Sequence, residues 1–121
     1  MLRRILSVSR NYGLLLTRND LLAVAGYSVA SPRDPADAPV LFRSERFDAV
    51  LIGDSVLPPE RKRIIEDLRS IRSGIPILYL FADPGRKHEP FADESVDVTG
   101  SPEPLLTALE RHIKLRGRKA A

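Results

Sequence analysis

Short apolar runs alternate along the chain with longer segments whose apolar residues recur at helical spacing. The clearest run is Ala-Val-Leu-Ile at positions 49–52, which follows Asp48 and precedes Gly53 and Asp54. A short continuous run with β-branched residues, bounded by polar residues, is typical of a strand buried on both faces. Further strands are predicted at residues 4–9, 27–30, 75–81 and 95–98.

A helix is predicted between the first two strands. Leu14, Leu21 and Ala25 fall on one face of it, and two more leucines lie beside that face. Gly26 follows, and glycine readily adopts the left-handed conformation that ends many helices. We therefore expect the helix to end at this glycine.

Three more helices are predicted downstream. Asp34 before Pro35 is a start signal, because a capping acid precedes a proline at the first helical position. Pro39 lies within the same helix, which should therefore be short or distorted. The other two helices begin after Leu57 and Ser101. Their apolar stripes contain Ile64, Ile65, Leu68 and Ile71 in the first, and Leu105, Leu106, Leu109 and Ile113 in the second.

Strands that alternate with helices imply βαβ units, a parallel sheet and right-handed crossovers. Five strands in this length predict a three-layer α/β/α sandwich, flavodoxin-like, with strand order 2-1-3-4-5. Strands 1 and 3 are neighbours in that order, and ligand sites of such sheets lie beyond the carboxyl ends of the strands. Ser9 and Arg10 should therefore face Gly53 and Asp54.

Composition is that of one ordinary globular domain. The chain has 121 residues, of which 43% are hydrophobic and 29% charged, and it has no cysteine, which excludes disulfides and thiolate chemistry. It has no long apolar run and no signal peptide, so we expect a cytoplasmic protein without membrane insertion. We expect one domain over residues 1–115 and a basic, solvated tail at 116–121. The net charge of +3 is mild.

In order and spacing, this pattern resembles the receiver domain of bacterial two-component response regulators, of the CheY-like type. The likeness covers nearly the whole chain and rests on residues 5–8, 21–29, 47–52, 75–80, 92–93 and 102–105. Typical receivers carry a full helix between their fourth and fifth strands. Here residues 83–92 hold two prolines and a glycine, so we expect that fourth helix to be shortened or absent.

The resemblance implies phosphoryl transfer from a histidine kinase to an aspartate, but most of the required residues are missing. The acid pair that holds Mg²⁺ falls on Ser9 and Arg10, the hydroxyl position on Phe81, and the lysine position on Val98. The phosphoacceptor falls on Gly53 when counted from Asp48, or on Asp54 when counted back from Pro58. We therefore expect a degenerate phosphoacceptor pocket comprising Ser9, Arg10, Gly53, Asp54, Phe81 and Val98.

Two expectations concern how this pocket is rebuilt. The guanidinium of Arg10 could pair with Asp54 and take the place of the metal, or both side chains could be exposed and independent. Phe81 is expected to fill the emptied pocket. Asp54 remains the candidate phosphoacceptor, and Mg²⁺ is expected only if it is active; otherwise we expect no metal, no cofactor and no enzymatic activity.

The leading interpretation is a stand-alone pseudo-receiver, a receiver-like signalling domain that binds a protein partner without being phosphorylated. We expect that partner to be a histidine kinase or another regulator, and the chain to be a monomer or a weak homodimer. Nucleic acid is not expected as a partner. The alternatives are a phosphorylatable receiver that uses Asp54, and an accessory protein that contacts nucleic acid through Arg61, Lys62, Arg69 and the basic C-terminus.

Overall fold

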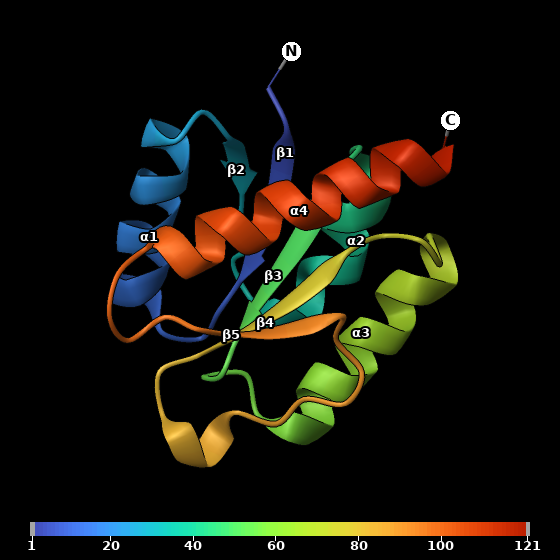
Figure 1. Cartoon of the computed structure of the whole chain (residues 1–121). Coiled ribbons are helices and arrows are strands. Elements are labelled where there is room, and N and C mark those ends of the chain that lie inside the picture. The colour runs from blue at the N-terminus through green and yellow to red at the C-terminus, as the bar shows by residue number, and fades with distance from the viewer. Residues whose placement is uncertain (1, 121) are drawn as a thin grey trace.

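A five-stranded parallel sheet forms the centre of the computed structural model, which describes residues 2–120 (Figure 1). The strand order is β2-β1-β3-β4-β5, as the sequence predicts. The strands are β1 Arg4–Val8, β2 Ser28–Ala30, β3 Ala49–Gly53, β4 Ile77–Phe81 and β5 Glu94–Asp97.

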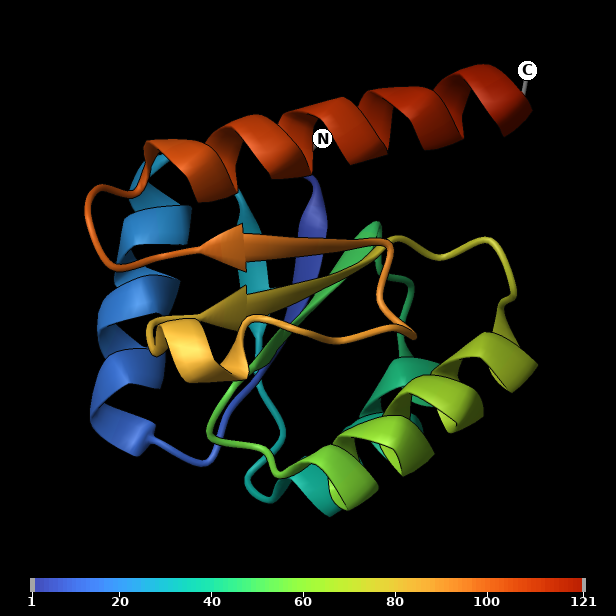
Figure 2. The same cartoon turned by 60° about the horizontal axis from the view of Figure 1, so that its bottom comes forward.

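Helices cover both faces of the sheet, which gives the three-layer α/β/α sandwich that the sequence predicts. Figure 2 shows α4 and α1 on one side of the strands and α3 and α2 on the other. The helices are α1 Tyr12–Val24, α2 Ala38–Ser44, α3 Pro58–Ile71 and α4 Glu103–Ala120. Two short 3₁₀ helices are η1 Pro35–Asp37, directly before α2, and η2 Pro84–Arg86, between β4 and β5. The fourth helix of the expected fold is therefore reduced to η2.

The central strand β3 is buried along its whole length and separates two apolar clusters. Val50 and Ile52 pack on the side of α2 and α3, whereas Ala49 and Leu51 pack on the side of α1 and α4. Because side chains alternate along a strand, Gly53 continues the second series and faces α1. This alternation places the last residue of β3 directly under a helix.

The structure decides which leucines of α1 face the sheet. Leu15 and Leu22, predicted beside the apolar face that contains Leu14, are its buried residues, whereas Leu14 is 51% exposed. The helix is apolar on several sides, so periodicity alone does not decide which leucines face the sheet. Its end is as predicted, since Gly26 has a φ of 101°.

The expected solvated tail at 116–121 is largely helical. The backbone of α4 continues to Ala120, and Ala121 lies outside the described residues. Long straight-chain residues and alanine favour helix, which is consistent with this extension. Within residues 2–120, no helix combines the length and the apolar character that crossing a bilayer requires.

Candidate functional site

The loops that follow β1 and β3 meet at the carboxyl edge of the sheet, as predicted. The Oγ atoms of Ser9 and Ser55 lie 2.9 Å apart, and Ser9 is only 9% exposed. Ser55 Oγ also accepts hydrogen bonds from the backbone N–H groups of Arg10, at 2.9 Å, and Asn11, at 3.2 Å. Two serine hydroxyls thus hold the loops together.

The side chain of Arg10 turns away from this edge. Its Nε donates to Glu60 Oε1 at 2.8 Å, its Nη2 lies 2.5 Å from Glu60 Oε2, and Asp34 Oδ1 lies 3.5 Å away. The hydrogen bond to Glu60 is the main cause of a raised pKa for Arg10. The predicted pair between Arg10 and Asp54 is therefore wrong, because carboxylates on α3 and before η1 bind the guanidinium instead.

Arg18 of α1 provides the positive charge that was expected from Arg10. A Cβ atom built on Gly53 would lie 3.5 Å from Arg18 Nη1 and 3.6 Å from Ser9 Oγ. Burial lowers the pKa of this arginine, and the charge of Asp54 opposes that shift. The guanidinium therefore lies over the end of β3, where glycine leaves room for it.

Sequence reasoning missed Arg18, although a signal was present. The residue follows Leu14 by four positions and precedes Leu21 by three, so it shares a helix face with both. A long side chain on such a face can extend its methylene stem along apolar neighbours and carry its charge toward the sheet edge.

The backbone and side chain of Asp54 both contact β4 or the residues after it. Its N–H donates to Leu80 O at 2.9 Å, and its Oδ2 accepts from the backbone N–H of Ala82 at 3.0 Å. Arg86 Nη1 lies 3.4 Å from its carbonyl oxygen. The carboxylate is thus held at the edge of the sheet, beside a cavity of about 250 Å³ that Arg18 also lines.

The two remaining predicted site residues, Val98 and Phe81, lie in different places. Val98 lines the same cavity as Asp54. Phe81 instead packs against the apolar cluster on the α3 side, with its ring centroid 6.3 Å from that of Tyr79. The expectation that Phe81 fills the emptied pocket is therefore wrong. Of the six candidates, Ser9, Gly53, Asp54 and Val98 gather at this edge, whereas the side chains of Arg10 and Phe81 lie elsewhere.

Arg61 is the largest departure from the predicted basic surface. It is 4% exposed, and its Nε lies 2.6 Å from Oε1 of Glu89 in the loop between β4 and β5. Its guanidinium also donates to Val56 O at 2.7 Å and lies 4.3 Å from the ring centroid of Tyr79. Arg61 precedes Ile64 by three positions, so it shares the inner face of α3 and not the solvated one.

The same loop is fixed at two further points. Glu89 Oε2 accepts the backbone N–H of Phe91 at 2.8 Å, and the buried Tyr79 donates its hydroxyl to Arg86 O at 2.5 Å. The segment that replaces a helix is therefore bound to α3 and β4 through side chains. Arg69 also contributes, with Asp93 at 3.1 Å.

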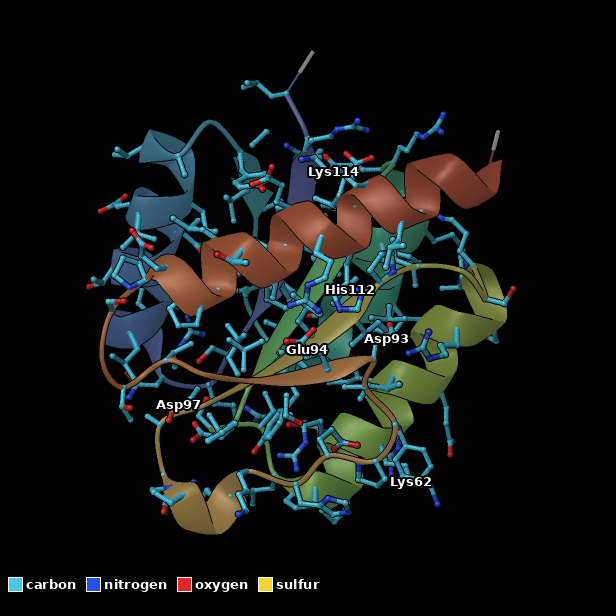
Figure 3. All side chains as sticks on the ribbon, viewed as in Figure 1. Lys62, Asp93, Glu94, Asp97, His112 and Lys114 are labelled. Carbon is cyan, nitrogen blue, oxygen red and sulfur yellow. The ribbon has the colours of Figure 1, made fainter. Side chains whose placement is uncertain are left out.

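A second charged cluster joins β5 to α4. Figure 3 shows Glu94 and His112 facing one another. Glu94 Oε1 lies 2.9 Å from His112 Nε2 and 2.6 Å from Arg111 Nη1. The hydrogen bond from Arg111 is the main cause that lowers the pKa of Glu94.

Replacing Glu94 with glutamine should lower the free energy of unfolding at pH 7 by less than about 1 kcal/mol, as for a partly exposed pair. A carboxyl group whose pKa is lowered in the folded state stabilises the protein at pH values above its ordinary pKa of about 4.3. This stabilisation is lost as the pH falls through the lowered, folded-state pKa. Urea unfolding from pH 7 to pH 3 should therefore show the two proteins converging in acid. A difference in unfolding free energy between the two proteins that grows toward low pH would contradict this role of Glu94.

Comparison with solved structures identifies the fold of this chain. A response-regulator receiver domain from Methanospirillum hungatei superposes with a TM-score of 0.84 at 18% identity, over 98% of this chain and 99% of that one. The chemotaxis protein CheY4 of Vibrio cholerae gives a TM-score of 0.78 at 24% identity, over 92% and 98%. The chain has the CheY-like receiver fold.

A third receiver was solved with bound ligands. The response regulator TrrA of Thermotoga maritima, in complex with Mg²⁺ and beryllium fluoride, gives a TM-score of 0.81 at 18% identity, over 92% of this chain and 99% of that one. No protein-family model matches the sequence, and comparison with curated proteins gives no match either. The likeness is therefore one of fold.

The residues of this receiver fold do not suit the Mg²⁺ ion that active receivers use. Magnesium needs oxygen ligands, mostly carboxylate and water. Ser9 and Arg10 occupy the positions of the acid pair, and the guanidinium of Arg18 lines the same cavity as Asp54. Across residues 2–120, no three side chains of aspartate, glutamate, histidine or cysteine lie close enough together to hold a metal.

Proposed function

We propose that this chain is a receiver-like signalling domain that binds a protein partner without being phosphorylated, and that it has no enzymatic activity or cofactor. One observation carries the proposal. The guanidinium of Arg18 lies over Gly53, at the place where β3 ends and a receiver would carry its reacting carboxylate. A positive charge at this place disfavours the binding of a second cation beside it.

The loop at 83–93 supports a binding role. Regulated receivers need a surface that changes with phosphorylation. Here the corresponding segment is held in place by hydrogen bonds from Arg61, Tyr79 and Arg69. A surface held in one conformation loses little conformational entropy when a partner binds. We infer that the partner, a histidine kinase or another regulator, contacts this loop, α4 or the outer face of α3.

The test uses thermal unfolding and intact mass on the wild type and on Asp54→Asn. Each protein is mixed with Mg²⁺ and beryllium fluoride, or with Mg²⁺ and acetyl phosphate. We expect no shift in melting temperature that depends on Asp54, and no added phosphate mass. The Thermotoga maritima receiver solved with beryllium fluoride is the positive control for the reagents.

The alternative is a phosphorylatable receiver, favoured by the position of the Asp54 carboxylate at the sheet edge, where Ala82 N–H binds one of its oxygens. A melting shift that is present in the wild type and lost in Asp54→Asn would support that alternative and refute the proposal. The basic surface predicted for nucleic acid is less favoured, because Arg61 is buried and Arg69 is paired with Asp93.

A further inference from the structure

The cavity between α1 and the start of α4 has a chemical character that a protein-binding role does not explain. Figure 2 shows α1 beside the loop that leads from β5 into α4. The walls of the cavity are mostly apolar and come from both sides of this gap. The apolar residues are Leu14 and Leu21 of α1, Ala82 after β4, and Val98, Pro102 and Leu105 around the start of α4.

Two opposite charges line the same cavity. Arg18 comes from α1 and Asp54 from the end of β3, so the backbone holds them on different elements. They are close enough for the carboxylate to influence the guanidinium, yet they form no ion pair within 4.0 Å in the structure of residues 2–120. Ala82 N–H binds Oδ2 of Asp54 and leaves Oδ1 for another donor.

We propose that this cavity binds a single apolar α-amino acid as its zwitterion, with the carboxylate on Arg18 and the ammonium group on Asp54. A simple carboxylate would meet the repulsion of Asp54, and a simple amine that of Arg18. A zwitterion carries both charges on groups bonded to the same carbon atom, and one such molecule satisfies both side chains. Its apolar side chain would then lie against the leucines and Pro102.

The size of the cavity limits the ligand to a small molecule. Its volume of about 250 Å³ lies below the range of roughly 300–1,000 Å³ in which drug-sized ligands bind. In a peptide, moreover, the free ammonium and carboxylate groups are separated by at least one peptide bond. The assignment goes beyond the proposed function, because it names a ligand and not a protein partner.

The test is a titration of the isotope-labelled full chain with L-leucine, followed by ¹H–¹⁵N NMR. We expect saturable shifts confined to α1, Asp54, Ala82 and the segment 98–105. Arg18→Gln and Asp54→Asn should each weaken binding at least about tenfold, as expected for loss of a hydrogen bond to a charged group. The matched controls are Arg63→Gln and Asp67→Asn, which change exposed residues of α3 and should bind leucine as the wild type does.

Two analogues of leucine test the contributions of its two charged groups one at a time. 4-Methylpentanoate lacks the ammonium group and 3-methylbutylamine lacks the carboxylate, and both should bind at least about tenfold more weakly than leucine. Equal binding of either analogue, no saturable shift with leucine, or leucine binding that survives Asp54→Asn would overturn the proposal. Thermal unfolding reports whether Arg18→Gln is folded, and if it is not, Asp54→Asn and the analogues decide. No phosphoryl analogue is used, so failure here leaves the beryllium fluoride result unaffected.

Discussion

Replacing Arg61 with methionine should lower the free energy of unfolding by about 3–5 kcal/mol, because it leaves the carboxylate of Glu89 buried without its cation. Both side chains are almost fully excluded from water, and their charged atoms lie 2.6 Å apart. The substitution also removes a hydrogen bond to Val56 O and the contact with the ring of Tyr79. Equilibrium unfolding in urea, followed by circular dichroism, measures the change.

Two further variants show whether the buried charge is the cause. Lys62→Met removes the neighbouring cation, whose only ion pair among the described residues is an exposed one with Glu66 at 3.9 Å, and should change the stability by about 0.5 kcal/mol or less. Combining Arg61→Met with Glu89→Leu should recover much of the loss, since a buried pair can be replaced by apolar groups at little cost. A double variant as unstable as Arg61→Met alone would contradict this account.

Replacing Arg72 with methionine should cost about 1.5–3 kcal/mol, the value typical of hydrogen bonds made by charged groups. Arg72 Nη2 donates to Phe42 O at 2.8 Å and to Glu45 O at 2.9 Å, and its guanidinium lies 4.3 Å from the ring centroid of Phe42. The side chain thus connects the end of α3 to the last turn of α2 and to the residue that follows it. Unfolding in urea measures this change as well.

The stability cost of Arg72→Met should also depend on salt concentration, which gives a second test. Burial is the main cause that lowers the pKa of Arg72, and the charges of Arg116 and Arg46 add to it. Salt screens that repulsion in the wild type, so the cost of Arg72→Met should grow as ionic strength rises. Arg63→Met, at an exposed position of α3, is the control and should stay within about 0.5 kcal/mol. Equal costs for the two variants would refute the role of Arg72.

The backbone architecture could be predicted from the sequence because it follows from local patterns. The apolar run in β3, the glycine after α1 and the prolines between β4 and β5 each act within a few residues, and the structure agrees with all three. The strand order then follows from the alternation of strands and helices. Predicting these features requires no knowledge of which side chains contact one another across the fold.

The positions of the arginines could not be predicted in the same way. Arg61 finds its partner 28 positions away in the chain, and Arg10 is bound by acids from two other segments. A long cationic side chain reaches several possible partners, and its choice depends on how elements pack in three dimensions. Arg18 was missed for this reason, even though its helix face was visible in the sequence.

The two edges of the sheet restrict how another protein can associate with it. The edge strands β2 and β5 contain three and four residues, the fewest of the five strands that the structure describes. A strand added to either edge would gain only a few backbone hydrogen bonds, and short edges are one way in which proteins avoid sheet extension between chains. If the proposed function holds, a protein partner should therefore recognise side chains on helices and loops, and substitutions there, not in the edge strands, should weaken its binding.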